Sequence, residues 1–211
     1  MNPRIDHIVI GSADLISGTK ILENKLSTKF SSGGEHKIMG THNNLLKLQS
    51  NIYLEVIATN PNANKPSRQR WFSLDETGIK EKIKKSPRLL CWVVEVDDIE
   101  DTAKKCGYNP GETLLLSRDE LTWKVTVPSN GKLVENGVLP VLIQWPSNQH
   151  PSKKLNNSKV SINKISLFHP EPHKIRSIIS NLIESDLIHV SEGFPKMELI
   201  LTTQNEKVVI D

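Results

Sequence analysis

Short apolar runs typical of strands alternate along this chain with longer segments of helical spacing. Residues 4–11 read RIDHIVIG, a strand-like run in which His7 takes a position where the pattern favours an apolar residue. A segment from Ser12 to about Leu26 follows, with leucines at amphipathic spacing and Ser12 or Asp14 as its N-cap. Three extended segments complete the group: KFSSGGEHK, NNLLKL and IYLEVIA. This group therefore predicts the order β-α-β-β-β.

The same order of elements recurs twice. The second group opens with RLLCWVVEV, after which Asp97 or Asp98 caps a short helix that Gly107 closes, and three extended runs follow. The third group opens with VSINKISLFH, and its helix carries an aliphatic stripe from Ile175 to Ile183 before three more extended runs. Repetition explains three such groups better than chance does. We therefore predict an α+β fold built from repeated β-α-β-β-β modules.

Two polar, turn-rich stretches mark the boundaries of these modules. We expect module 1 at residues 3–61, a linker or lid segment at 62–87, module 2 at 88–147 and module 3 at 158–211, packed as one globular unit. A single sheet with one helix leaves its other face uncovered, so the modules should pair. With three modules, the sheet of one module has no partner module to cover its open face. Either packing of the third module on the others or a homodimer would bury it.

Several short blocks in the first two modules carry a family resemblance. The runs IDHIVIGSADL, GGEHKIMGTHNNLLKL and YLEVIATNP, followed by RWFSLD, LPVLIQW and HPS, resemble the glyoxalase-like domain branch of the vicinal oxygen chelate superfamily, over roughly residues 4–151. The resemblance implies paired modules that form a curled mixed sheet around a cavity, with the helices outside. In metal-using members, ligands lie on the first and last strands of each module. Carried onto this sequence, module 1 offers His7 and Glu55 as metal ligands.

Strand alternation agrees with that placement. In the first strand Ile5, His7 and Val9 share one face, and Asp6 shares the other with the remaining isoleucines; Glu55 lies opposite its own strand's aliphatic row. If a helix covers the aliphatic faces, His7 and Glu55 point into the cavity. They could hold one divalent ion (Zn, Mn, Fe or Ni), with Glu55 as the catalytic residue or a bound water moving the proton, or form a charge pair without any metal.

The second module departs from the metal-binding pattern. Cys91 is aligned with His7, and either Ile143 or Gln144 is aligned with Glu55. A catalytic zinc usually takes three protein ligands. The third would have to come from His42, Gln144 or Cys91, so we expect metal binding to be weak or absent.

Further residues are candidates for binding a small molecule in the cavity. His42 and Asn43 are neighbours on a strand, so one lies on each face, and the sequence leaves open which one faces the cavity. Gln144 is a third polar candidate. We assign no chemistry to His36, read as a loop residue, or to His150, read as a turn residue.

Aromatic residues form a second group of candidates. Arg70, Trp71 and Phe72 make an apolar cluster with one charge inside a polar linker, so this segment should plug the cavity or act as its lid. Trp123 and Trp145 lie on strands of module 2, where they either wall the pocket or fill the core.

Composition and charge exclude several classes of function. The net charge of +3 is small and dispersed, which argues against nucleic acid, and the densest basic run, KEKIKKSPR, fits a solvated helix face better than a polyanion site. No apolar run is long enough to span a membrane, and the start of the chain has no apolar signal region, so we expect a cytoplasmic protein. Cys91 and Cys106 have no disulfide or zinc spacing and are read as free thiols.

Two classes of function remain open. The first is a metal-assisted lyase or isomerase, or a dioxygenase-type enzyme, of unknown substrate. The second is a protein that binds or sequesters a small, antibiotic-type molecule in the same cavity without metal. The departures in module 2 favour binding, whereas the retained His7 and Glu55 favour an enzyme.

Overall fold

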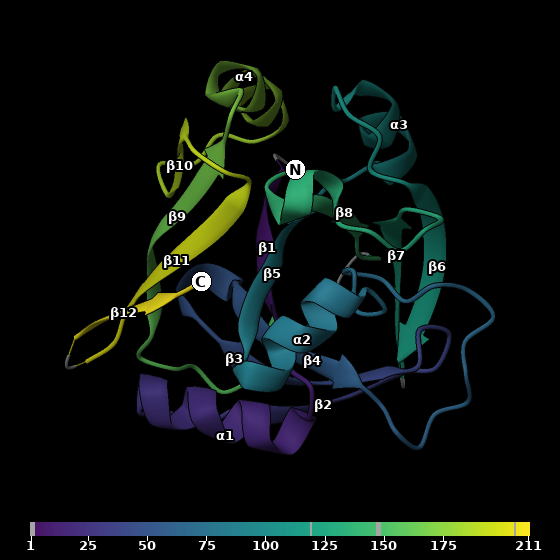
Figure 1. Ribbon diagram of the computed structural model, residues 1–211, viewed down its shortest axis with the longest axis vertical. Helices are drawn as coiled ribbons and strands as arrows, with labels where there is room; N and C mark the ends of the chain where they lie inside the picture. Colours follow the sequence, from purple (N-terminus) through teal and green to yellow (C-terminus); the bar gives the residue numbers. More distant parts are fainter. Residues whose placement is uncertain (1–2, 119, 147–148, 205) are drawn as a thin grey trace.

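A curled mixed sheet with helices on its outside dominates the computed structural model, which describes residues 3–118, 120–146, 149–204 and 206–211 (Figure 1). The sheet has eight strands in the order β2-β3-β4-β1-β5-β8-β7-β6. Its strands are β1 (Arg4–Gly11), β2 (Ser31–His36), β3 (Thr41–Lys47), β4 (Tyr53–Thr59), β5 (Arg88–Glu95), β6 (Glu112–Arg118), β7 (Leu121–Val127) and β8 (Val141–Gln144). The predicted α+β class is confirmed.

The first two modules meet at the centre of this sheet. β1 pairs in parallel with β4, β5 pairs in parallel with β8, and the two halves join where β1 and β5 run antiparallel. Helix α1 (Leu15–Leu26) begins at Asp14, whose side chain accepts from the backbone N–H of Ser17, and α3 (Ile99–Lys105) begins in the same way at Asp98. Gly107 follows α3 with a φ of +82°, which suits glycine at a helix end. Sequence and structure therefore agree on both halves.

The third module keeps the order of elements but not the strand pairing of the others. It contains β9 (Ser161–His169), α4 (Pro172–Leu182), β10 (Ile188–Glu192), β11 (Lys196–Thr202) and β12 (Lys207–Ile210). They form a separate sheet in the order β10-β9-β11-β12, in which the first strand pairs in parallel with the second. In the first module the first strand pairs instead with the last. The order along the chain did not determine the pairing.

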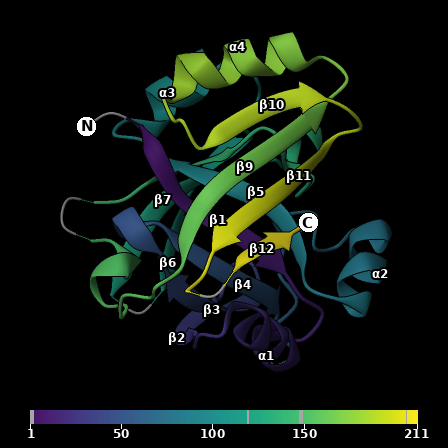
Figure 2. The same ribbon diagram turned by 90° about the vertical axis from the view of Figure 1, so that its left-hand side faces the viewer.

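The four-stranded sheet lies across the outer face of the central strands of the large sheet (Figure 2). Aliphatic side chains of β1 and β5 form one buried cluster with those of β9 and β11, and α1, α3 and α4 add to its edges. Ile8, Val94, Leu167 and Leu199 are among its most buried members. The chain itself therefore covers the outer face of the central strands.

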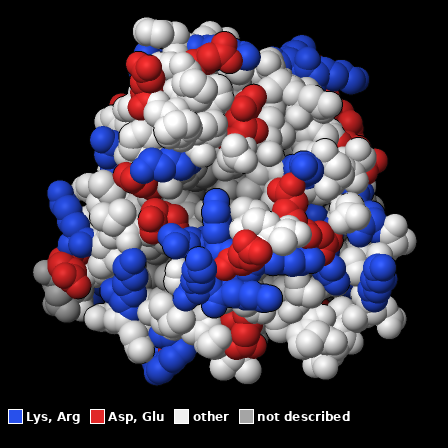
Figure 3. Space-filling model, viewed as in Figure 1, with Lys and Arg blue, Asp and Glu red and all other residues white. Residues whose placement is uncertain are grey.

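The linker after β4 forms part of the inner core. Trp71, Phe72 and Leu74 are buried against the concave face of the large sheet. Helix α2 (Thr77–Lys85) follows, with Ile83 as its buried residue, while its lysines lie among acidic side chains on the surface (Figure 3). The basic run is thus a solvated helix face.

Three short 3-10 helices complete the elements: η1 (Gln49–Asn51), η2 (Val134–Gly137) and η3 (Pro151–Lys153). The stretch between modules 2 and 3 contains η3, and residues 147–148, where module 2 ends, lie outside the described residues. Across the described part of the chain, helices are too short or too polar to cross a membrane.

The shared outer core predicts that both sheets unfold together. Leu199 on β11 is fully buried, so Leu199→Ala should lower the free energy of unfolding by about 2–5 kcal/mol. All four tryptophans precede residue 146, in module 2 and in the linker before it that packs on the large sheet, so their fluorescence reports on that sheet. We expect the tryptophan transition in urea to shift with the far-UV transition. Val209→Ala, on the exposed side of β12, is the control. An unchanged tryptophan midpoint in Leu199→Ala would mean that the third module unfolds separately.

Candidate functional site

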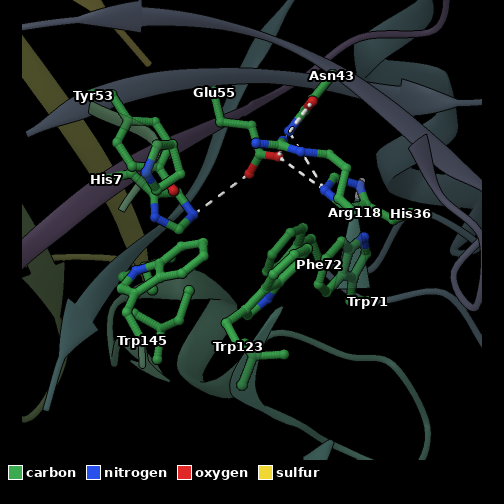
Figure 4. Close-up of a pocket in the computed structure, with 14 residues that line it drawn as sticks. His7, His36, Asn43, Tyr53, Glu55, Trp71, Phe72, Arg118, Trp123 and Trp145 are labelled. Atoms are coloured by element: carbon green, nitrogen blue, oxygen red, sulfur yellow. Dashed lines mark hydrogen bonds and ion pairs between the residues drawn. The ribbon is translucent and has the colours of Figure 1, made fainter. Parts of the chain in front are cut away.

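The concave face of the large sheet encloses a cavity to which every one of its eight strands contributes (Figure 4). Its empty volume is about 390 Å³, part of it continuous with solvent, and the space open to the centres of water-sized molecules is about 30 Å³. At about 10–15 Å³ each, that is room for two or three waters. The lining residues are His7, His36, Asn43, Tyr53, Glu55, Trp71, Phe72, Val93, Arg118, Trp123, Val125, Ile143, Trp145 and Pro151.

A bulge in β1 determines which side chains face this cavity. The register of β1 against β5 shifts between Ile5 and His7, so Asp6 has no partner on β5. Ile5 therefore packs in the outer cluster, and the carboxylate of Asp6 reaches the ring of its neighbour His7. Strict alternation placed Ile5 with His7 and Asp6 with the outer isoleucines, and this prediction was wrong. A bulge re-aims side chains in this way.

Asp6 is fully buried and accepts hydrogen bonds from three parts of the chain. His7 Nδ1 binds one of its oxygens, while His150 Nε2 and Trp145 Nε1 each lie 2.9 Å from the other. His150 is held in turn by the hydroxyl of Ser152, 2.6 Å from its Nδ1. Burial alone would raise the pKa of Asp6, but the bonds to His150 and His7 outweigh burial and hold the pKa well below its usual range.

His7 is placed between two carboxylates. Its Nδ1 binds Asp6, and its Nε2 lies 3.5 Å from Glu55 Oε2. Each carboxylate favours a proton on the nitrogen that it faces, so the ring is held as an imidazolium cation. Burial would lower the pKa of His7, yet the bonds to Asp6 and Glu55 raise it to about 9. Tyr53 stacks on the ring at 4.6 Å between centroids.

Glu55 is the anionic partner in the cavity. Burial would raise its pKa, but the bond and charge of His7 outweigh that effect, and with help from Asn43 the pKa falls to about 2. The Asn43 amide donates to Glu55 Oε1 through Nδ2, while its Oδ1 accepts from the N–H of Gly34 at 2.9 Å and from Arg118 Nη1 at 3.1 Å. Donors at one end and a carboxylate at the other fix the orientation of this amide.

His36 is the second histidine of the cavity. Its Nδ1 lies 3.1 Å from the hydroxyl of Thr41, and its ring contacts Trp71 edge-on with centroids 4.9 Å apart. Burial is the main cause that lowers the pKa of His36 to about 4, against the opposing charge of Glu55. The ring is therefore neutral at pH 7.

The structure brings most of the residues selected from sequence to this cavity. The candidates that line it are His7, Asn43, Glu55, Trp71, Phe72, Trp123 and Trp145. Asn43, which is buried, is thus the cavity-facing member of the pair left open by the sequence, and the half-buried His42 lies on the other face of β3. Trp71 and Phe72 form a wall of the cavity from the linker.

Two further candidates do not line the cavity. Arg70 Nη1 pairs with Asp75 Oδ1 at 2.8 Å within the same segment. Gln144 accepts from the N–H of Ile99 at 3.2 Å and donates to the carbonyl of Asp97 at 2.6 Å, so it caps α3. Both side chains have structural partners that fix nearby turns.

Sequence reasoning missed several polar residues of the site. Arg118 lies at the end of β6, next to a charged turn, and was not among the candidates. His36 is buried on β2, and His150 is buried beside Asp6, although both had been read as loop or turn residues. A signal was available for His150, because a histidine followed by Pro151 within a polar linker is an unusual place for an aromatic ring.

The donors of the cavity do not fit a bound metal ion. His7 Nε2 is turned to Glu55 as a proton donor, and His36 Nε2 lies 4.0 Å from the other oxygen of Glu55. Among the described residues these three do not bring their donor atoms within 4.8 Å of one another. On the second module, the residues that face the cavity include Val93 and Ile143, which have no donor atoms. The ligand set expected from paired modules is therefore incomplete.

One group in the described chain does bring three donors within 4.8 Å, namely Asp6, Glu95 and His150, and such a group could hold a metal ion. All three residues already have polar partners. Both oxygens of Asp6 accept N–H bonds, including the one from Trp145, and Glu95 pairs with Arg4. A cation would have to displace these donors, so the group fits a satisfied polar network better than a metal centre.

A family model described as a glyoxalase-like domain matches residues 5–183. No curated protein matches the chain. Among solved structures, a hypothetical protein from Staphylococcus aureus is similar, with 19% identity and a TM-score of 0.57 over 99% of this chain and 84% of that chain. At this identity the likeness concerns the fold alone.

Methylmalonyl-CoA epimerases also match. The one from Mycobacterium tuberculosis has 14% identity and a TM-score of 0.41, over 67% of this chain and 87% of that chain. A variant from Streptomyces coelicolor, in complex with 2-nitronate-propionyl-CoA, has 13% identity and a TM-score of 0.44, over 68% of this chain and 98% of that chain.

The pKa shifts of the buried pair predict how stability depends on pH. The pKa of His7 is raised from 6.5 to about 9, so its contribution is complete below pH 6.5 and is lost as the pH rises through 9. The pKa of Glu55 is lowered from 4.5 to about 2, so its contribution is complete above pH 4.5 and is lost as the pH falls through 2. The pair therefore stabilises the folded protein most between pH 4.5 and pH 6.5.

His7→Gln should reduce the free energy of unfolding by about 3–5 kcal/mol at pH 6, because it leaves buried carboxylates without their cation. The difference from the unmodified protein should shrink toward pH 9, as measured by urea unfolding at both pH values. His173→Gln, at an exposed histidine of α4, should follow the unmodified protein. A difference that stays constant from pH 6 to pH 9 would contradict a charged His7.

Proposed function

Because the chain belongs to the glyoxalase-like domain family of the vicinal oxygen chelate superfamily, we propose that it binds a small organic molecule in its cavity without a metal ion. The family gives the cavity its position on the concave face of paired modules. The side chains of this chain give the cavity its chemistry. Binding or sequestration is therefore the function that we infer.

The observation that carries the proposal is the environment of His7. A metal ligand must offer a lone pair, and both nitrogens of this ring face carboxylate oxygens. The imidazolium and Glu55 neutralise each other, so the cavity keeps its polar side in place without a cation from outside. Loading a metal would require His7 to lose a proton at a pKa of about 9.

The walls of the cavity support the binding of an organic ligand. Aromatic rings of Trp71, Phe72, Trp123 and Trp145 face the polar side, and Val93, Val125 and Ile143 add aliphatic groups to the lining. Aromatic and aliphatic walls with a few fixed polar groups are typical of small-molecule sites. The small free volume restricts the ligand to few atoms unless the aromatic side chains move.

Proton transfer is supported less well than binding. A general base or acid works best when its pKa lies near the operating pH. The pKa values of Glu55 and His36, about 2 and about 4, lie well below neutral, and that of His7, about 9, lies well above. At pH 7 each of these groups keeps one protonation state, which suits a fixed recognition surface.

Ligand binding can be measured through the tryptophans of the cavity. We expect some short-chain carboxylic acids, amides or ketones to change the tryptophan fluorescence in a saturable way, and EDTA to leave that change unaltered. Val93→Phe should abolish it, because the larger side chain fills the cavity, whereas Val209→Phe on the exposed side of β12 should not. Melting temperatures would verify that both variants fold.

Two results would contradict the proposal. One is binding that EDTA removes and zinc restores, which would indicate a metal site. The other is an unchanged fluorescence response in Val93→Phe, which would place the ligand elsewhere.

A further inference from the structure

Arg118 is the charged residue of the cavity with the fewest partners. Its exposure is 9%, although arginine is rarely this buried without a paired charge. Arg118 Nη1 donates to Asn43 Oδ1 at 3.1 Å, a neutral acceptor. Among the residues that the structure describes, which exclude its neighbour at 119, no carboxylate oxygen forms an ion pair with it within 4.0 Å, in contrast with His7. Most of the guanidinium donors are thus free for a ligand.

A second unused donor belongs to a residue that lines the same cavity. The indole Nε1–H of Trp71 is buried and has no hydrogen-bond acceptor among the described residues. Leaving a buried donor unpaired costs stability, so a polar donor of this kind needs an explanation. Figure 4 shows Arg118 on the polar side of the cavity and the aromatic side chains, Trp71 among them, facing it across the open space.

The acceptors of the cavity are, by contrast, already engaged. Glu55 is bound by Asn43 and faces His7. The Asn43 oxygen already accepts from Gly34 and Arg118. A ligand that offers hydrogen-bond donors would compete with these bonds. A ligand that offers acceptors would instead bind the free donors of Arg118 and Trp71.

From this imbalance we propose that the ligand is a small carboxylate whose oxygens are bound by the guanidinium of Arg118. The inference rests on the proposed binding function and names its ligand class. A carboxylate matches the planar fork of arginine, which can donate two parallel bonds to it. An amide or ketone offers one oxygen and no charge. An ammonium group would be repelled by the positive charge of Arg118.

The fold holds Arg118 where the two edges of the sheet meet. β6 and β2 are the outermost strands, and curling brings them together. A Cβ at Gly34 on β2 would lie 2.5 Å from Cδ of Arg118, so the glycine leaves room for the arginine stem. Gly34 also donates its N–H to Asn43, which in turn accepts from Arg118. Gly34 is therefore a positioning residue.

The free volume limits the size of the carboxylate. The space of about 30 Å³ has room for two or three waters, so ligands of the size of acetate or propionate fit without movement of the walls. This makes acetate and propionate the probes, and acetamide and propionamide their neutral counterparts of similar shape.

The test is a titration followed by NMR of the indole N–H groups in nitrogen-15-labelled protein. We expect acetate or propionate, at constant ionic strength held with chloride, to shift the Trp71 indole signal in a saturable way and the amides to bind at least about tenfold more weakly. Trp92, whose Nε1 donates to the carbonyl of Val138 in the outer core at 2.9 Å, is the internal reference.

Variants then separate recognition from folding. Arg118→Gln should weaken carboxylate binding to the level of the amides, whereas Arg176→Gln on the surface of α4 should leave it unchanged. Gly34→Ala keeps the charge and should still weaken carboxylate binding, because the added methyl group displaces the Arg118 stem. It serves as the second test if Arg118→Gln does not fold, as judged by the Trp92 signal.

The outcomes distinguish this inference from the proposed function. If amides bind as tightly as carboxylates, or if Arg118→Gln and Gly34→Ala leave the affinity for carboxylates unchanged, the ligand class is wrong while the cavity still binds small molecules. If neither kind of molecule shifts an indole signal of the cavity, the proposed function fails, and the inference fails with it.

Discussion

The burial of one carboxylate, that of Asp6, imposes the order found in the rest of the site. A charge inside a sheet must be matched by donors, and these come from three separate positions: His7 on the same strand, Trp145 after β8 and His150 in the linker that follows. Asp6 holds His7 as a cation. The cation keeps Glu55 ionised, and Glu55 orients the amide of Asn43.

The same network ties the linker after β8 to the centre of the sheet. His150 links η3 to β1 across 144 residues of sequence, and its ring also contacts Trp145 with centroids 5.6 Å apart. Breaking this bond costs stability because it removes one of the two donors to that oxygen of a fully buried carboxylate. Trp145 and Pro151 line the cavity, so the donors that neutralise Asp6 also hold this part of the wall in place.

Much of the fold could be predicted from sequence because local patterns determine its elements. Apolar runs predicted the strands, and capping residues predicted where two helices begin, although the structure had to select Asp14 over Ser12 and Asp98 over Asp97. The order of the strands within each sheet was harder to predict from the sequence. The third module has the same order of elements as the first, yet β9 pairs with β10 rather than with its last strand. Which edges meet depends on packing across the outer core, and a linear pattern does not contain that information.

The site shows where local reasoning ends. Alternation placed His7 and Glu55 correctly because most of β1 and β4 is regular. It failed at Ile5 and Asp6, where a bulge shifts the register. The residue types at these positions do not indicate a bulge. Arg118 was missed for another reason: its partner Asn43 lies 75 residues away, and only the closing of the sheet brings the two together.

The two modules that build the cavity have diverged into complementary halves. Module 1 supplies the histidines, Asn43, Tyr53 and Glu55, whereas module 2 supplies aliphatic and tryptophan side chains, with Arg118 as its charged member. A symmetric pair of modules could place metal ligands on both sides of an ion. Here a cation between the halves would meet donors on one side only. A ligand with a polar end and an apolar body would suit both halves at once, since its polar end can bind Arg118 at the end of β6, beside Asn43, while its body contacts the aromatic rings opposite. The asymmetry of the duplicated unit thus favours an organic ligand over an ion and fixes the direction in which that ligand must lie.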